Sequence, residues 1–257
     1  MSDRPIAVVT GAGRGIGRRI ALALAGAGHD VVLAARSEED LAAVAEECRQ
    51  LGAGALAVAT DLRVAAEVER LRQEVGAFGP VGVLVNNSGV GGPSGPLWEI
   101  EPEDWAETLA VNVTGVFLCC RAFLPEMVER RSGAVINIGS ITGKRPLLNR
   151  SPYATSKMAL VGLTRTLALE AGPYGVRVNL ISPGFVEGPR IDWVIERQAA
   201  ARGVDPETVR AEFTAESPLG RFTGPDDVAA VAVFLASQQA AAITGADINV
   251  NAGVVMY

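Results

Sequence analysis

Short apolar runs alternate with longer amphipathic segments along most of the chain. The runs carry no interior charge, a pattern typical of strands buried on both faces of a parallel sheet. We expect strands at residues 6–9, 31–35, 55–60, 82–86, 134–139, 177–182 and 247–250. Between them, apolar residues recur at helical intervals, and we expect helices at residues 18–28, 38–51, 65–78, 102–131, 151–170 and 225–237, with an irregular helical stretch at 187–213.

This alternation predicts the fold class. Strands separated by helices favour a Rossmann-like, doubly wound α/β fold, in which a parallel sheet of about seven strands carries helices on both faces. The chain has 257 residues, of which 49% are apolar, enough to supply one full core. It contains no internal repeat and no linker-like segment, so we expect residues 1–257 to form a single domain.

A glycine-rich turn follows the first expected strand and precedes the first expected helix. Glycines 11, 15 and 17 allow a tight turn and a close approach of the backbone to a ligand. The free N–H groups and the dipole of the helix N-terminus attract a pyrophosphate. The segment therefore predicts a dinucleotide site.

Tyr153 and Lys157 lie four positions apart in an expected helix and should project from the same face. A fixed cation beside a phenol favours the phenolate and lowers its pKa from the usual value of about 10. Such a tyrosine can serve as a general acid or base. Taken alone, a Tyr–Lys pair at this spacing is more often a surface pair, so the assignment depends on the rest of the chain.

Several motifs occur in the order and at the separations of one known family. They are TGAGRGIG at 10–17, Asp61-Leu62, NNSG at 86–89, Asn112 within VNVTG, Ser140 within NIGS, YATSK at 153–157 and SPG at 182–184. On these residues the chain resembles the short-chain dehydrogenases/reductases of the compact, single-domain type over nearly its whole length.

The resemblance implies a role for each matching position. Tyr153 corresponds to the general acid/base, Lys157 to the residue that lowers its pKa and binds the nicotinamide ribose, and Ser140 to the hydroxyl that polarises the substrate carbonyl. Asn112 corresponds to a residue that holds a water in a proton relay. The implied cofactor-binding residues are Gly11, Arg14, Gly15, Ile16, Gly17, Arg36, Asp61, Leu62, Asn86, Ser88, Gly89, Tyr153, Lys157, Pro183, Gly184 and Val186. No metal site is expected.

The cofactor can be inferred from the end of the second expected strand. An acidic residue that would bind a ribose 2′-hydroxyl is missing there, and Arg36 follows the strand directly. Arg14 lies within the glycine turn, and two guanidinium groups suit a 2′-phosphate. We therefore expect NADP(H), with NAD(H) as the alternative. By resemblance, Asp61 would contact the adenine amino group and Leu62 would pack beside it.

The chain departs most from the family between residues 185 and 222, where the resemblance places a lid over the substrate. Gly188 stands where the family often has a threonine that binds the nicotinamide carboxamide, so that contact is missing or is replaced, for example by the Val186 backbone. Several arginines lie in this stretch, but acids are interleaved with them, a pattern that favours a solvated helical face over an anion site.

Bulk properties exclude several classes of function. A net charge of −6 gives no basic surface for nucleic acid, and no apolar run reaches the roughly 20 residues that would span a membrane. The three cysteines have no metal-ligand spacing, and with no signal peptide we expect a cytoplasmic protein. His29 is expected at the surface. Apolar residues on several sides of two long helices, including Phe117 and Phe123, favour a homodimer or homotetramer.

These observations favour an oxidoreductase that moves a hydride between NADP(H) and a carbonyl or secondary alcohol, with a 3-oxoacyl-type or cyclic ketone as the generic substrate. One alternative is an NAD-dependent dehydrogenase of a sugar, polyol or ring alcohol. A second, of another class, is a dinucleotide-sensing module without turnover. The presence of a general acid argues against the sensor, which has no use for one.

Overall fold

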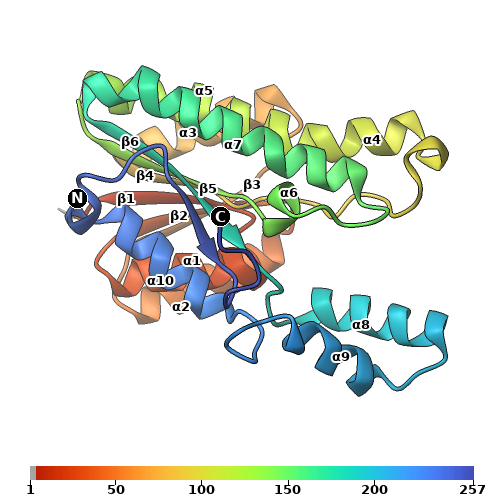
Figure 1. The fold of residues 1–257 in the computed structure, drawn as a ribbon. Helices are drawn as coiled ribbons and strands as arrows, with labels where there is room; N and C mark the ends of the chain where they lie inside the picture. Colours follow the sequence, from red (N-terminus) through yellow and green to blue (C-terminus); the bar gives the residue numbers. More distant parts are fainter. Residues whose placement is uncertain (1–3) are drawn as a thin grey trace.

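The computed structural model describes residues 4–257 and contains one seven-stranded sheet in the order β3-β2-β1-β4-β5-β6-β7, with every neighbouring pair parallel (Figure 1). The strands are β1 (Ile6–Thr10), β2 (Asp30–Ala35), β3 (Ala55–Ala59), β4 (Val81–Asn86), β5 (Gly133–Ile138), β6 (Val176–Pro183) and β7 (Asp247–Val250). This confirms the predicted fold class, and the predicted strands differ from the observed ones by one residue or so at each end.

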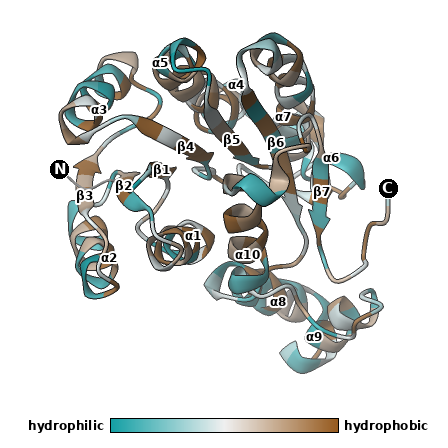
Figure 2. Ribbon diagram, turned by 90° about the vertical axis from the view of Figure 1, so that its left-hand side faces the viewer, coloured by the Kyte–Doolittle hydropathy of each residue, from teal (hydrophilic) through white to brown (hydrophobic). Residues whose placement is uncertain are grey.

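Helices cover both faces of the sheet (Figure 2). One face carries α1 (Gly15–Gly26), α2 (Glu38–Gln50) and α10 (Pro225–Ala236); the other carries α3 (Ala65–Phe78), α4 (Pro102–Leu109), α5 (Gly115–Glu129) and α7 (Ser151–Ala171). The short α6 (Ile141–Lys144) follows β5, and 3-10 turns occur at Leu97–Glu99, Gly172–Tyr174 and Gln238–Ala240. Each helical layer buries its own apolar cluster against the sheet. Burial on both faces therefore explains why charged residues occur only near the beginning of a strand, as Asp30, Arg177 and Asp247 do.

The expected long helix at 102–131 is interrupted. A π-helical turn at Ala110–Thr114 joins α4 to α5, and the combined stretch Pro102–Glu129 is long and apolar enough to cross a membrane by length and composition. One such helix is weak evidence for a membrane span, because the core helix of a globular protein has the same length and composition. Cys119, Phe123 and Met127 of this stretch are buried in the core, as expected for a core helix of a globular fold. Phe123 thus belongs to the core rather than to a free face.

Two further expectations are corrected by the structure. The stretch after β6 is not irregular: α8 (Pro189–Arg202) and α9 (Pro206–Ala215) are regular helices that share a small apolar core containing Ile195, Val209 and Phe222. They lie to one side of the sheet (Figure 1). His29, expected at the surface, is only 9% exposed, and burial lowers its pKa.

The C-terminal residues pack against the segment that follows α9. The carbonyl of Ala252 accepts hydrogen bonds from the Leu219 N–H (3.3 Å) and from the Ser217 hydroxyl (2.8 Å). These two hydrogen bonds therefore hold the residues after β7 against the segment that follows α9.

The glycine turn between β1 and α1 is held by contacts that leave no room for a side chain at Gly17. A Cβ there would lie 2.2 Å from the Gly11 carbonyl oxygen and 2.4 Å from Asn87 Nδ2. At Gly26, at the other end of the same helix, a Cβ would meet nothing within 4 Å.

We therefore predict that Gly17→Ala lowers the free energy of unfolding by about 1–3 kcal/mol, because the backbone of the turn must move. Gly26→Ala is the matched control and should stay within about 1 kcal/mol of the wild type or be more stable. Chemical denaturation of both variants measures the difference. Equal stability of the two variants would show that the turn is not closely packed.

Candidate active site

Three of the predicted catalytic residues meet at the carboxyl end of β5. Tyr153 and Lys157 lie one turn apart in α7, and Ser140 follows β5 as the N-cap of α6, where its hydroxyl accepts a hydrogen bond from the Thr142 N–H (3.1 Å). The Lys157 Nζ lies 5.8 Å from the centre of the Tyr153 ring and donates to the Ile138 carbonyl (2.8 Å). The helical spacing thus places the ammonium beside the phenol, as predicted.

The electrostatic surroundings of Tyr153 favour its phenolate. Burial alone would raise the pKa of the phenol, but the charges of Lys157 and Arg190, together with a hydrogen bond from Ser140, outweigh burial and lower the pKa below its usual range. Lys157 is 5% exposed, and its burial lowers its own pKa, an effect that the negative phenolate opposes. The pair is therefore suited to proton transfer at a lower pH than an isolated tyrosine would allow.

Asn112 lies in the π-helical turn between α4 and α5 and is completely buried. Its side chain accepts from the Val90 N–H (2.8 Å) and donates to the Val90 carbonyl (3.0 Å) and to the Ser156 hydroxyl (2.9 Å). A Cβ on Gly89 would lie 3.3 Å from both Asn112 Oδ1 and Lys157 Nζ. Asn112 therefore joins the loop after β4 to α7 beside Lys157, at an irregular helical turn of the kind often found at functional sites.

The glycine turn lies where the strand order reverses, between β1 and β4, which is the usual place for ligands in open α/β sheets. Gly11 and Gly15 have φ values of +64° and +56°, which favour glycine. The first turn of α1 contains no acidic residue, and its N-cap, Arg14, makes no side-chain cap. The N–H groups at this helix end are thus available to an anion. Ile16 packs partly into the core behind the turn.

Two residues that the sequence analysis did not select hold this turn in place. The Thr10 hydroxyl accepts from the N–H groups of Asn87 (3.0 Å) and Ser88 (3.1 Å), and Asn87 Nδ2 donates to the carbonyls of Thr10 (2.9 Å) and Gly11 (3.2 Å). Thr10 and Asn87 belong to the motifs TGAGRGIG and NNSG, so the sequence already indicated that these two positions matter. The bonds themselves join residues far apart in the chain and depend on the β1–β4 pairing.

The adenosine end of the predicted site has two exposed arginines. Arg14 is the N-cap of α1 and Arg36 follows β2 directly, and neither forms an ion pair within residues 4–257. Asp61 accepts from Arg63 Nε (2.9 Å), and this bond lowers the pKa of the carboxyl, with a smaller contribution from Arg36. Leu62 is buried against Gly115 rather than open to a ligand.

Asn86 does not point toward the glycine turn. Its side-chain nitrogen donates to Oδ1 of Asn137, the buried residue beside it on β5 (2.9 Å). The Oδ1 of Asn86 has no hydrogen-bond partner among the described residues. A contact of Asn86 with a dinucleotide would have to come from its backbone. The predicted role of Asn86 in cofactor binding therefore stays a prediction about its backbone.

The loop after β6 explains one departure from the family pattern. Pro183 ends the strand, and the Gly184 N–H donates to the Val250 carbonyl (2.9 Å), while Val186 pairs with Thr223. Gly188 is the N-cap of α8 and has a φ of +135°, a backbone conformation that residues other than glycine rarely adopt. A threonine would be strained there, so the backbone geometry itself disfavours the usual carboxamide-binding residue.

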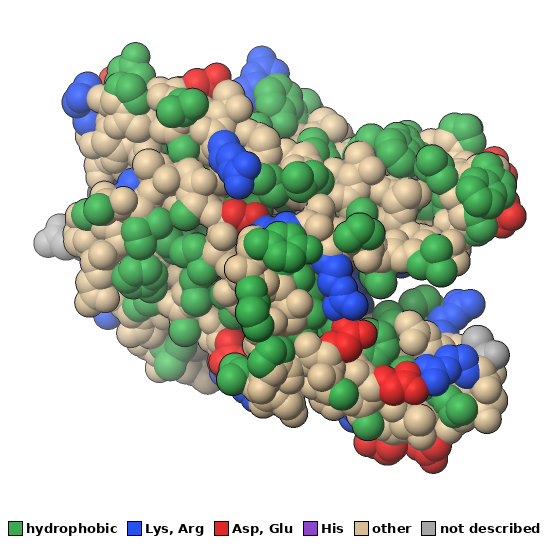
Figure 3. All heavy atoms as spheres, in the orientation of Figure 1, with side chains coloured by type: hydrophobic (Ala, Val, Ile, Leu, Met, Phe, Trp, Pro, Cys, Tyr) green, Lys and Arg blue, Asp and Glu red, His purple; other side chains and the backbone are tan. Residues whose placement is uncertain are grey.

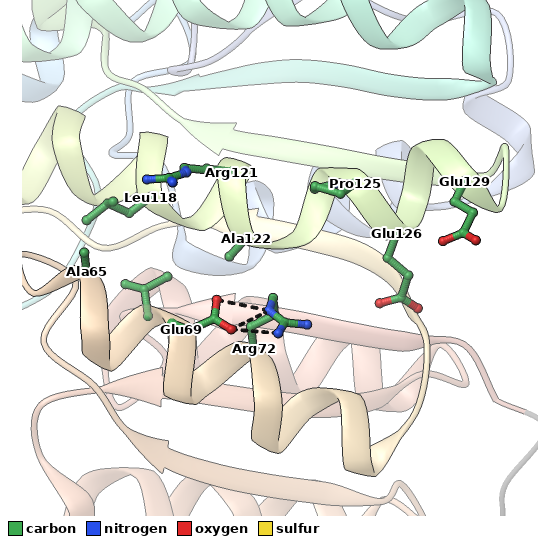
Figure 4. A pocket seen from close by; sticks show the side chains of 10 residues that line it. Ala65, Glu69, Arg72, Leu118, Arg121, Ala122, Pro125, Glu126 and Glu129 are labelled. Carbon is green, nitrogen blue, oxygen red and sulfur yellow. Dashed lines mark hydrogen bonds and ion pairs between the residues drawn. The ribbon is translucent and has the colours of Figure 1, made fainter.

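The surface is hollowed between α4 and the α8–α9 pair, beside the strand ends that carry these residues (Figure 3). Two ion pairs join the end of α6 to distant segments: Arg145 pairs with Glu216 (2.6 Å), which follows α9, and Lys144 pairs with Asp247 of β7 (2.8 Å). A separate groove of about 680 Å³ lies between α3 and α5 (Figure 4). It contains none of the predicted site residues and is lined by the Arg72–Glu69 ion pair.

Comparisons with known proteins agree with this geometry. The family model "short chain dehydrogenase" matches residues 5–199. A putative ketoacyl reductase of Streptomyces coelicolor is 38% identical over 99% of this chain and 98% of its own. The crystal structure of a variant of actinorhodin polyketide ketoreductase with NADPH superposes with a TM-score of 0.94 at 38% identity, covering 99% of this chain and 98% of that one. NAD⁺-bound xylitol dehydrogenase gives a TM-score of 0.91 at 30% identity, covering 97% and 98%.

Proposed function

The chain belongs to the short-chain dehydrogenase/reductase family, and we propose that it reduces the ketone of a 3-oxoacyl-type substrate with NADPH. The observation that carries the proposal is the environment of Tyr153, a half-buried residue whose phenol has a lowered pKa between Ser140 and Lys157. Membership of the family, which confirms the resemblance seen in the sequence, makes the protein an oxidoreductase acting on C=O and CH–OH groups.

In the proposed mechanism each side chain has one task. The Ser140 hydroxyl donates a hydrogen bond to the ketone oxygen and fixes the carbonyl next to the phenol. Bound NADPH supplies the hydride for the carbonyl carbon. Tyr153 gives its proton to the oxygen, so that an alcohol forms and a phenolate remains. The Lys157 ammonium stabilises that phenolate, and Asn112 holds the adjoining loop and a water through which the proton is replaced.

The residues at the glycine turn fit a dinucleotide phosphate. The helix N-terminus has free N–H groups, no acid in its first turn, and an exposed glycine at position 15 where a Cβ would meet nothing within 4 Å. The unpaired guanidinium groups of Arg14 and Arg36 favour a 2′-phosphate over a bare hydroxyl. NADPH in the similar polyketide ketoreductase supports the same choice.

The alternatives have weaker support. An NAD-dependent polyol dehydrogenase would be consistent with the similarity to xylitol dehydrogenase, but the ketoreductase structure is similar at higher identity and TM-score. A dinucleotide sensor without turnover would have no use for a phenol of lowered pKa.

We further propose that α8 and α9 form the substrate lid, because they lie beside the hollow and pack on their own small core. A cytoplasmic homo-oligomer is also proposed. Its support is the apolar surface of α5 and α7, where Phe117 is 48% and Leu169 80% exposed.

Tyr153→Phe should lower kcat for ketone reduction by about 100- to 10,000-fold, the usual contribution of a general acid, with little change in the Kd for NADPH. Steady-state assays and fluorescence titration measure the two quantities. Tyr174→Phe, the same change at an exposed tyrosine outside the site, is the control. Retained turnover in Tyr153→Phe would refute the mechanism.

Arg36→Asp should weaken NADPH binding by about 10-fold or more, because a bond to the 2′-phosphate is replaced by repulsion, and should weaken NADH binding much less. Arg165→Asp, an equal charge change at an exposed position of α7, controls for the overall field. Equal losses for both dinucleotides would place Arg36 outside the 2′-phosphate site.

A further inference from the structure

Two arginines from separate segments converge on the Tyr153 ring. Arg150 precedes α7 and Arg190 lies in the first turn of α8, and the Cζ of each is 5.4 Å from the ring centre. Together with Lys157, they place three cationic groups around one phenol. Neither arginine belongs to a motif that carried the family resemblance.

Both guanidinium groups also meet at Gly91, in the loop after β4. Arg150 Nη2 donates to the Gly91 carbonyl (2.7 Å), and a Cβ on Gly91 would lie 2.6 Å from Arg190 Nη2 and 3.1 Å from Arg150 Nη2. The absence of a side chain at Gly91 therefore leaves the space in which the two guanidinium groups approach each other.

These two arginines lack the anionic partners that their neighbours have. Arg145 pairs with Glu216, Arg202 with Glu212 and Arg210 with Asp192, but within residues 4–257 neither Arg150 nor Arg190 forms an ion pair. The acids interleaved along α8 and α9 thus neutralise Arg202 and Arg210, as the sequence pattern indicated, and leave Arg190 out.

The surroundings make this accumulation of charge unfavourable in the absence of an anion. Burial and the charge of Arg190 both lower the pKa of Arg150, and the Tyr153 phenolate opposes them only in part, so the two cations destabilise each other. Arg190 also lies at the N-terminal end of α8, where the helix dipole is positive and disfavours a cation. An anion bound between the two groups would remove both penalties.

We propose that Arg150 and Arg190 form a carboxylate subsite beside Tyr153, and that the substrate is an oxo acid with its free carboxylate a few bonds from the reacting ketone. This rests on the proposed function, since the subsite is defined relative to the ketone that Tyr153 protonates. Guanidinium forks match the planar carboxylate and bind it in bidentate fashion. A short 3-oxo acid carries its carboxylate on the carbon next to the ketone, and its ester or thioester lacks the charge.

Two other roles for the pair make different predictions. If the arginines only stabilised the phenolate, their loss would slow acidic and neutral ketones equally. If they bound the phosphates of the dinucleotide, their loss would weaken NADPH itself. The discriminating quantity is therefore the ratio of kcat/KM for an oxo acid to that for its own ester.

The test compares 3-oxobutanoate with ethyl 3-oxobutanoate at constant ionic strength in the wild type, Arg150→Ala and Arg190→Ala. The wild type should prefer the acid, and each substitution should lower the acid-to-ester ratio by about 30-fold or more, as for the loss of one partner of a charged hydrogen-bonded pair. Arg197→Ala, which removes an exposed charge from the same helix, should leave the ratio unchanged. Gly91→Ala, which keeps both arginines but displaces the Arg190 guanidinium, should also lower it.

Calorimetric titration with malonate, in the presence of NADP⁺, gives a second measurement without turnover. Malonate should bind the wild type and Arg197→Ala, and should bind Arg150→Ala and Arg190→Ala at least about 10-fold more weakly. Malonate binding that all four proteins share, an ester preferred to the acid, or a parallel loss of NADPH affinity would each overturn the subsite.

The two proposals fail in different ways. Reduction of the ester with no preference for the acid would leave the ketoreductase function standing and remove the subsite. If no ketone were reduced at all, the proposed function would fall. The arginine-dependent binding of malonate would then still show whether these two residues hold a carboxylate.

Discussion

The site depends on one electrostatic constraint, the burial of the Lys157 ammonium against the Tyr153 phenol. Placing an ammonium out of water costs several kcal/mol unless a partner compensates. Here the Ile138 carbonyl accepts one hydrogen bond at 2.8 Å, and the remaining stabilisation grows as the phenol loses its proton. The charge of the buried ammonium therefore lowers the pKa of the tyrosine, and the burial of the phenol opposes this shift. Because Ile138 ends β5 and both side chains come from α7, the packing of that helix on the sheet sets the chemistry.

The sheet supplies the second half of the site. The strand order reverses between β1 and β4, and the loops that leave these strands diverge there and expose the N-terminus of α1. Thr10 and Asn87 connect the two loops through hydrogen bonds between side chains and backbone, while Asn112 connects the β4 loop to α7. This series of hydrogen bonds thus fixes the position of the glycine turn relative to Tyr153 in α7.

The parts that could be predicted from sequence are those encoded locally. Apolar runs gave the strands, and the spacing of Tyr153 and Lys157 gave their shared face, because helix geometry fixes which side chains meet. Contacts between distant segments were missed: Arg150 and Arg190 meet at Gly91 only after the β4 loop and the starts of α7 and α8 have been brought together. The burial of His29 was misjudged for the same reason, since burial is decided by the elements that pack against a residue. The regularity of α8 and α9 was missed in the sequence because their apolar core is small and their surface is highly charged.

The pH dependence of a single turnover of NADPH oxidation, with the ester of a 3-oxo acid in excess, tests the role of Tyr153 most directly. Reduction needs the protonated phenol, so the rate should fall as the pH rises through the lowered pKa of Tyr153, with a midpoint below the usual range of a tyrosine. In Lys157→Met, where the neighbouring cation is gone, the midpoint should move to higher pH. A rate that stays constant up to the ordinary pKa of tyrosine, or an unchanged midpoint in Lys157→Met, would contradict the assignment of Tyr153 as a proton donor tuned by Lys157.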